Sequence, residues 1–408
     1  MTTILKNGKM FDGTGNALIN NAVIIIGDNG RIIEAGSEES VKLPVESALK
    51  TRNLKGKFIL PGLVDVHIHM DLHGMANTYE ENLVEDKLRS IRAAAEMEKT
   101  LEAGFTTVRN VGSVNAIDFS VKKAVEEGWV NGPRILTSGK ILSITCSGTD
   151  YFNNLYRVCD GYAEFKKAAR EQLKNAADLL KVMATGAIMN PGGVPGAEQP
   201  DVRELEAIVE EGNKLGKKVA AHAHGAQGIK NSVRAGVATI EHGTYADEEA
   251  VKMMADNNVY LVPTLIVGHL MRGHGQEAGI PGFMIEKAEE GHLFRLNAIK
   301  KSISYGVNIA MGTDAGTPYN YHGKNALEIA LYVQEGLMTP AEAIKSATKY
   351  AAEACGLGEE IGTIEKGKLA DLIIVDGNPL ENIEVLCDKD CISTVFKEGL
   401  PVKDLEVN

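Results

Sequence analysis

Hydrophobic and polar positions near the two ends of the chain follow the short patterns of β-strands. Residues 22–27 form a β-branched run, residues 28–30 (Asp-Asn-Gly) are a turn signal, and residues 31–36 resume the strand pattern. We therefore predict a hairpin over residues 22–36. Residues 362–376 return to strand character far along the chain. The simplest arrangement joins both ends of the chain in one small β-sandwich.

Between about residues 63 and 315 the pattern changes to short apolar runs that alternate with helical stretches, such as 83–103 and 203–215. In the second stretch, Leu205, Ile208 and Val209 form an apolar stripe among acidic neighbours. Such alternation is typical of βα units around a parallel sheet. The candidate strands are 63–70, 105–112, 134–139, 179–186, 218–225, 239–245, 260–267 and 308–316.

This number of βα units over roughly 250 residues is the size of a closed (β/α)8 barrel. We therefore predict an α/β fold in which residues 61–357 form a TIM-type barrel. Residues 1–60 together with 358–408 form the predicted β-sandwich domain. A doubly wound open sheet is the alternative, but no Gly-rich phosphate-binding turn follows its first strand.

Composition narrows the class of protein. The 408 residues are 44% hydrophobic and 24% charged, which is ordinary for a globular enzyme, and the net charge is -12. No Lys/Arg-dense stretch is present to neutralise phosphates, which argues against a nucleic-acid partner. No stretch approaches the roughly 18 consecutive apolar residues of a membrane span. The start shows no secretory pattern and the five cysteines are scattered, so we expect a cytoplasmic protein with reduced thiols.

The candidate chemistry lies in or at the ends of the predicted barrel strands, where such barrels place their active sites. His67 and His69 are two residues apart on one strand, so their side chains point to the same face. Lys181 interrupts an apolar run, which is costly for a charged amine unless it is paired or deprotonated. Later predicted strands carry His222, His224, His242 and Asp314.

Each of these residues alone has a simpler explanation. A histidine pair can be satisfied within a core, a lysine can extend its amine to the surface, and an aspartate can cap a helix. All of these explanations would have to hold at once on five different strands. A shared metal site accounts for the whole set with one cause, so the pattern favours a metalloenzyme.

The set His67-x-His69, Lys181, His222, His242 and Asp314 resembles the amidohydrolase superfamily, and specifically its imidazolonepropionase-related branch. Supporting phrases are ILPGLVDVHIH at 59–69, GFTTVRN at 104–110, AAHAHG at 220–225 and KGKLAD at 366–371. These phrases run from the first barrel strand to the tail. Within the branch, the chain looks most similar to prolidase-like and arginine-carboxypeptidase-like dipeptidases and, more distantly, to ochratoxinase.

The resemblance implies two divalent metals, for which zinc is the best fit and manganese, cobalt and iron are alternatives. His67, His69 and Asp314 would hold one metal, and His222 and His242 the second. Lys181, carboxylated by carbon dioxide, would bridge the two. His222 is preferred to His224 on the spacing seen in the family, and this choice stays open. His224 is then a candidate for contact with the substrate.

The implied reaction is hydrolysis of a carboxamide or peptide bond by a metal-activated hydroxide, with Asp314 as general base and then general acid. The expected substrate is a small molecule, either a dipeptide of the Xaa-Pro or Xaa-Arg/Lys type or an N-acyl amino acid. Tyr245 and Arg109 are candidates for binding its carboxylate, although Tyr245 can instead pack at the rim and Arg109 can form a structural ion pair. The loop at 142–150 lacks the histidine-containing stretch usual in relatives, which puts dipeptide specificity in question.

Three alternatives remain. One is a cyclic amide hydrolase like imidazolonepropionase, and another is a mononuclear deaminase. Lys181 counts against both, because a bridging carbamate suits a two-metal site. The third is a non-catalytic scaffold, which would be expected to have lost a ligand, whereas every ligand position is filled. Members of the family often assemble, so a homo-oligomer is a further expectation.

Overall fold

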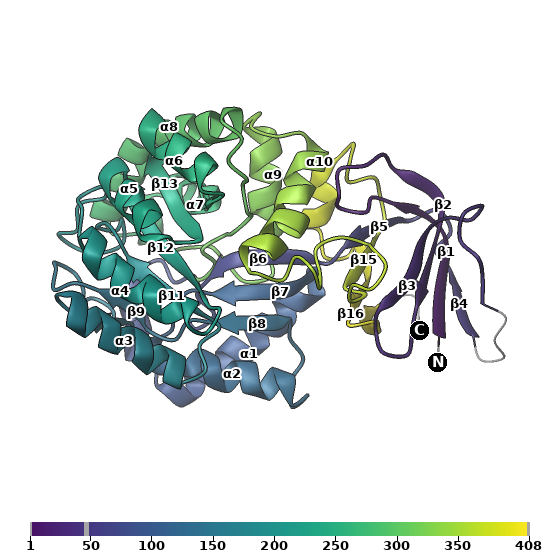
Figure 1. Ribbon diagram of the computed structural model, residues 1–408, viewed down its shortest axis with the longest axis horizontal. Helices are drawn as coiled ribbons and strands as arrows, with labels where there is room; N and C mark the ends of the chain where they lie inside the picture. The colour runs from purple at the N-terminus through teal and green to yellow at the C-terminus, as the bar shows by residue number, and fades with distance from the viewer. Residues whose placement is uncertain (1, 45–48, 406–408) are drawn as a thin grey trace.

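The chain folds into a barrel flanked by a smaller β-sandwich domain, seen at the right of Figure 1. This computed structural model describes residues 2–44 and 49–405. The outermost residues of the predicted sandwich, 1 and 406–408, and the segment 45–48 lie outside the description. Both ends of the described chain lie in the sandwich domain (Figure 1).

Strands from the two ends of the chain share one hydrogen-bonded sheet in the sandwich domain. The order is β17-β16-β15-β5-β1-β2-β3, with β4 beside β1. The predicted hairpin is confirmed, since β2 and β3 pair antiparallel. β5 lies between β1 and β15, so the strand that leads into the barrel is held by both ends of the chain. The bounds are β1 Thr2–Met10, β2 Ile19–Ile26, β3 Ile32–Ser37, β4 Leu49–Asn53, β5 Phe58–Pro61, β15 Leu372–Val375, β16 Ile392–Lys397 and β17 Leu400–Asp404.

The regular barrel strands are parallel, and each begins at the predicted residue. Between β8 and β11, the backbone N–H of Asp178 donates to the carbonyl of Thr137 at 2.8 Å. Segment 308–315 closes the ring between β14 and β6, through the bridges Leu261–Ile309 and Ile68–Ala315. The bounds are β6 Leu63–Ile68, β7 Phe105–Asn110, β8 Arg134–Thr137, β11 Leu179–Met183, β12 Lys218–Gly225, β13 Thr239–Tyr245 and β14 Tyr260–Val262.

Two predicted strands differ from the structure. The seventh ends at Val262 because Thr264 adopts φ 48° and a helix begins at Leu265. The eighth forms only isolated bridges rather than a regular strand, and the backbone turns at Asp314, where φ is 59°. Two short strands that were not predicted, β9 Ile141–Ser143 and β10 Tyr156–Val158, are inserted between β8 and β11.

Helices follow most barrel strands and form the outer layer (Figure 1). The predicted apolar stripe is present in α4, where Leu205 and Ile208 are buried and Asp201 with Glu204 forms a capping box. The α-helix bounds are α1 Asp86–Glu102, α2 Ile117–Glu126, α3 Tyr162–Lys174, α4 Val202–Asn213, α5 Ala226–Ala235, α6 Glu248–Asp256, α7 Leu265–His274, α8 Gly282–Ser304, α9 Ala326–Gln334, α10 Pro340–Lys345 and α11 Ala351–Ala354. Short helical turns are η1 Thr78–Leu83, η2 Val114–Ala116, η3 Gln276–Ala278, η4 Ser346–Tyr350 and η5 Ile383–Cys387.

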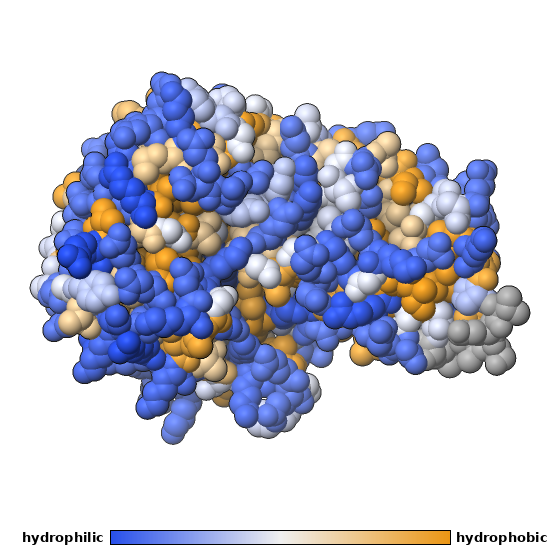
Figure 2. All heavy atoms as spheres, in the orientation of Figure 1, coloured by the Kyte–Doolittle hydropathy of each residue, from blue (hydrophilic) through white to orange (hydrophobic). Residues whose placement is uncertain are grey.

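On the face shown in Figure 2, hydrophilic residues predominate, and hydrophobic residues are visible over both the barrel and the sandwich domain. Among the described residues, no helix has both the length and the apolar character needed to cross a membrane. The five cysteines are free thiols, as their scattered positions suggested.

Candidate active site

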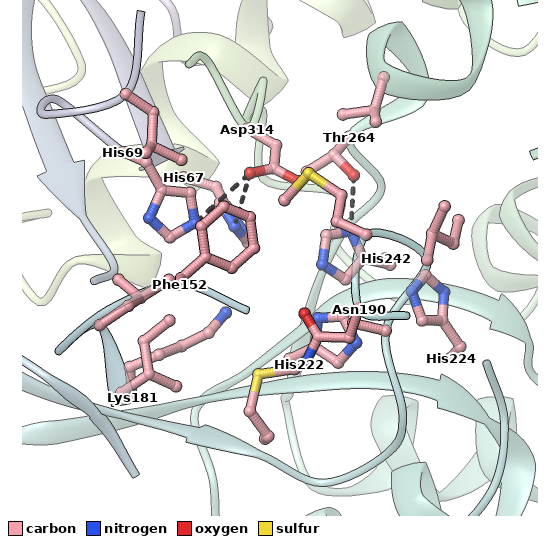
Figure 3. A pocket seen from close by; sticks show the side chains of 18 of the residues that line it. His67, His69, Phe152, Lys181, Asn190, His222, His224, His242, Thr264 and Asp314 are labelled. Atoms are coloured by element: carbon pink, nitrogen blue, oxygen red, sulfur yellow. Dashed lines mark hydrogen bonds and ion pairs between the residues drawn. The ribbon is translucent and has the colours of Figure 1, made fainter. Parts of the chain in front are cut away.

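The predicted metal ligands and His224 meet in one cavity in the barrel (Figure 3). They come from β6, β11, β12 and β13 and from the turn after the bridge at Ile309. The cavity is lined by all six predicted metal ligands and by the predicted substrate contact His224. These residues are His67, His69, Lys181, His222, His224, His242 and Asp314.

His67, His69 and Asp314 form the first group that could hold a metal, with ligand atoms within 4.8 Å of one another. The Nε2 atoms of both histidines lie 3.5 Å from Oδ1 of Asp314. Nδ1 of His67 is bonded to Oε2 of Glu241 at 2.6 Å, and Nδ1 of His69 to the carbonyl of Gly112 at 2.9 Å. These hydrogen bonds through Nδ1 orient both rings, as is usual for metal-binding histidines, and leave the Nε2 atom of each ring facing Asp314.

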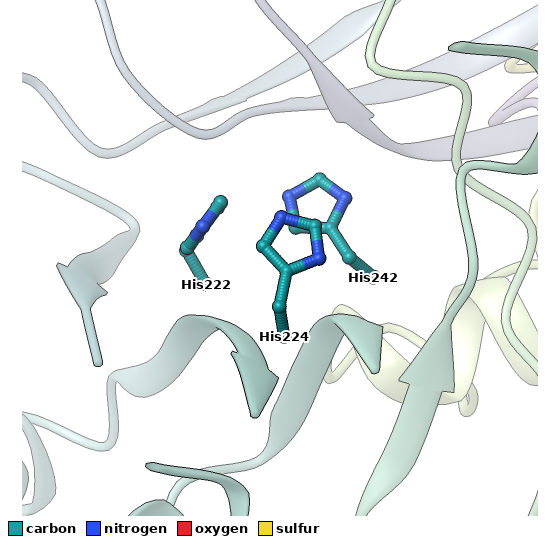
Figure 4. Close-up of side chains that lie close together, drawn as sticks. All are labelled: His222, His224 and His242. Carbon is teal, nitrogen blue, oxygen red and sulfur yellow. The ribbon is translucent and has the colours of Figure 1, made fainter. Parts of the chain in front are cut away.

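His222, His224 and His242 form the second group, and their ligand atoms also lie within 4.8 Å of one another (Figure 4). Nδ1 of His242 is bonded to the Thr264 hydroxyl at 2.7 Å, and Nδ1 of His224 to the Thr244 hydroxyl at 2.8 Å. His222 is held through the other ring nitrogen, Nε2, which lies 3.3 Å from the Gly186 carbonyl. Each ring therefore keeps one nitrogen free to act as a ligand.

Lys181 lies on β11, and its amine is directed toward the histidines (Figure 3). The side chain is buried, and burial lowers its pKa to about 8. Within the described part of the chain, Lys181 Nζ and Asp314 Oδ1 are both buried without a hydrogen-bond partner. An orphaned carboxylate oxygen, beside an amine whose burial favours the neutral form, fits a metal site, because buried polar groups normally find partners. The donor set of imidazole and carboxylate also suits divalent metals.

Glu241 and Arg109 form a buried ion pair behind the first group, with Nη2 of Arg109 2.9 Å from Oε1 of Glu241. Although burial opposes ionisation of Glu241, the charges of Arg109 and Lys181 hold the pKa of this carboxyl well below its usual range. Burial, reinforced by the Lys181 charge, lowers the pKa of His67 to about 4. His67 is therefore neutral, which is the form that binds metal.

Two predicted substrate contacts lie outside the lining of the cavity. The buried Arg109 guanidinium also donates to the Val66 carbonyl and to the Thr239 hydroxyl, which matches its structural alternative. Tyr245 is half-buried, and its ring lies 5.4 Å from that of Phe294 on α8. The structure therefore favours the structural alternative for Arg109, whereas a substrate contact by Tyr245 stays a prediction.

Three residues at the site hold left-handed backbone conformations, which are uncommon for residues other than glycine. His242 has φ 73°, Asp314 φ 59° and Thr264 φ 48°. Each conformation costs of order 1–3 kcal/mol, and such strain clusters at active sites. At His242 and Asp314 the turn sets the direction of a candidate ligand at the end of its strand.

Sequence reasoning missed part of the lining. Arg295 of α8 and Asn190 supply polar groups to the cavity. The buried face of α8 includes Met284, Ala288 and Ala298, and Arg295 occupies the same face. In the sequence, an arginine at a position of the apolar stripe of a helix is the signal that could have revealed Arg295 as a cavity residue. The apolar lining comes from Leu72, Ile141, Phe152, Leu155, Met183, Ala187, Ile188, Met189 and Val267.

Comparison with known proteins identifies the family. The profile described as "Amidohydrolase family" matches residues 58–402. The chain belongs to the amidohydrolase family. Ochratoxinase of Aspergillus niger is 31% identical over 428 residues, covering 97% of this chain and 86% of the relative. Imidazolonepropionase of Fusobacterium nucleatum is 24% identical over 424 residues, covering 93% and 91%.

Solved structures agree with this membership. A Xaa-Pro dipeptidase with methionine bound in its active site is 32% identical with a TM-score of 0.89, covering 99% of this chain and 100% of the other. A prolidase complexed with N-methylphosphonate-L-proline is 31% identical with a TM-score of 0.90 and the same coverage. The predicted family and the barrel with its β-sandwich domain are confirmed. The family and these hydrolase relatives make the chain a hydrolytic enzyme.

Proposed function

We propose that this enzyme hydrolyses the carboxamide bond of a small substrate, either a dipeptide or an N-acyl amino acid, with the help of two divalent metals. The observation that supports this most directly is the convergence of two ligand groups on a buried, unpartnered lysine amine. Relatives that are named as a Xaa-Pro dipeptidase and a prolidase support the choice of bond.

His67, His69 and Asp314 would hold one metal, and His222 with His242 the other. Lys181, carboxylated on Nζ, would bridge them, and zinc is our choice for this donor set. Bound metals of this kind generate a nucleophile from water at neutral pH and polarise the carbonyl. The protein supplies the orientation of the ligands, through Glu241 and Thr264 on His67 and His242.

We assign His222 rather than His224 to the second metal because of their neighbours. After burial, the Lys181 charge is the largest cause that lowers the pKa of His222. For His224, the largest causes after burial are His222 and Arg295. Lys181 is thus the leading charge on His222 and a lesser one on His224, so we assign His222 to the metal beside Lys181 and His224 to substrate contact.

Asp314 is the group that we assign to proton transfer. Its Oδ1 carries no hydrogen bond and lies next to both histidines of the first group. This oxygen would accept a proton from the attacking water and then deliver it to the leaving nitrogen, which is the general base and then acid role. Asp314 Oδ1 thus acts at both ends of the same reaction.

The test is a panel of Xaa-Pro dipeptides, other dipeptides and N-acyl amino acids, assayed for release of the free amino acid with metal content measured on the same sample. We expect hydrolysis that a chelator abolishes and added zinc restores. Hydrolysis of cyclic amides alone, or release of ammonia without cleavage of any acyl or peptide substrate, would refute the proposal in favour of the corresponding alternative.

A further inference from the structure

Arg295 is a buried cation with no carboxylate partner in the described part of the chain. It comes from the middle of α8, lines the cavity and is 3% exposed. Its guanidinium donates one long hydrogen bond, from Nε to the Thr244 hydroxyl at 3.4 Å. The same hydroxyl is bonded to Nδ1 of His224 at 2.8 Å, so the guanidinium lies beside the second histidine group.

Glu328 is the carboxylate whose charge acts most strongly on Arg295, yet its oxygens are already used. Oε1 accepts the backbone N–H of Leu265 at 2.8 Å, and Oε2 accepts that of Ile266 at 2.7 Å. A guanidinium has five N–H donors, and a buried charge without a close partner is costly. Arg295 thus retains donors that an anion entering the cavity can satisfy.

The rest of the cavity is poor in carboxylates. Among the described residues that line it, Asp314 is the one carboxylate, and it belongs to the first ligand group. The lining near Phe152, Leu155 and Val267 is apolar. A substrate ammonium group would therefore be buried without a free carboxylate, which is unfavourable. An uncharged apolar group would be buried at no such cost.

We propose that Arg295 binds the carboxylate of the substrate and that the other end of the substrate is uncharged and apolar. The inference rests on the proposed hydrolysis and narrows its substrate class to N-acyl amino acids rather than unblocked dipeptides. It also disfavours substrates with Arg or Lys side chains, because these would bury a further cation that has no free carboxylate partner in this cavity.

Three matched compounds test the inference. The first compound, 3-phenylpropanoyl-L-phenylalanine, carries the carboxylate and an uncharged acyl group. The second is the C-terminal carboxamide of the same compound, which lacks only the negative charge. L-Phenylalanyl-L-phenylalanine differs from the first compound only by its amino group. The set is repeated with Pro, Leu and Met as the leaving residue, and kcat/KM is measured for cleavage of the same internal bond.

For the wild-type enzyme we expect kcat/KM to be about 10- to 100-fold higher for the carboxylate than for the carboxamide, the range of one charge-assisted interaction. Arg295→Met should remove this ratio, and Arg295→Lys should retain part of it. Arg272→Met is the matched control, because Arg272 on α7 donates Nε to the Gly268 carbonyl and does not line the cavity. We expect Arg272→Met to keep the wild-type ratio.

A wild-type ratio near one would overturn the inference whether or not the Arg295→Met protein folds. An unchanged ratio in folded Arg295→Met would overturn it as well. If the unblocked dipeptide were cleaved as fast as the acyl compound or faster, the claim that the other end of the substrate is uncharged would be refuted. Failure of the inference is distinct from failure of the proposed function, in which no acyl or peptide compound in the set would be cleaved by the wild-type enzyme.

Discussion

Replacing Lys181 tests the bridge between the two ligand groups. At a pKa of about 8, about one quarter of this amine is neutral near pH 7.5, compared with about one in a thousand at the ordinary value of 10.5. Only the neutral amine reacts with carbon dioxide, so burial raises the reactive fraction by roughly 200-fold. The product is an anion placed among metal ligands. We therefore expect Lys181 to be carboxylated in the metal-loaded enzyme.

The assay is metal content per chain, measured on protein purified without chelator. We expect about two metal ions in the wild-type enzyme and about one or fewer in Lys181→Ala. Lys181→Glu should restore part of the loss, because it returns a negative oxygen ligand to the site. Labelling with ¹³C-bicarbonate should give a carbamate signal in the wild-type enzyme and none in Lys181→Ala.

Lys218→Ala is the control for this experiment. Burial also lowers the pKa of Lys218, but its amine donates to the Glu353 carbonyl and lies outside the cavity. This variant should keep the wild-type metal content. One metal ion in both the wild-type enzyme and Lys181→Ala, without a carbamate signal, would refute the bridge and favour a mononuclear site.

Further predictions concern the ligands and their support. Asp314→Asn should lower kcat by about 10²- to 10⁴-fold in steady-state kinetics, while metal analysis shows little loss of metal. A loss of metal as large as the loss of kcat would contradict the proton-transfer role. Arg109→Met leaves the Glu241 carboxylate buried without its cation, so the free energy of unfolding should fall by about 3–5 kcal/mol in urea titrations, and no measurable change would contradict the buried pair. His222→Asn should lower metal content, whereas His224→Asn should change kcat/KM at unchanged metal content; the reverse result would exchange their roles.

The fold could be predicted where the hydrophobic pattern was strong. The runs at 218–225 and 239–245 coincide with β12 and β13, because these strands are buried along most of their length. Apolar content alone could not show that the run at 260–267 changes from strand to helix at Thr264. Nor could it show that segment 308–315 closes the barrel by isolated bridges, since its apolar residues read as a strand.

The candidate ligands could be predicted because strand ends concentrate them at one mouth of the barrel. The hydrogen bonds that orient these ligands depend on tertiary structure instead. Thr264 bonds to His242 from the turn before α7, and Glu241 bonds to His67 across the barrel. The apolar lining from Phe152 and Leu155 lies in the insertion between β8 and β11, where no strand periodicity marks its direction.

β5 pairs with a strand from the far end of the chain, so its pairing is completed late in synthesis on the ribosome. β5 leads directly into β6 with His67 and His69, and its partner β15 is synthesised roughly 300 residues later. At about 5–20 residues per second, the ribosome needs tens of seconds to supply that partner. Throughout this time β5 can pair with β1 but not with β15. Because the candidate ligands extend from His67 to Asp314, we expect the proposed metal site to be completed only late in synthesis.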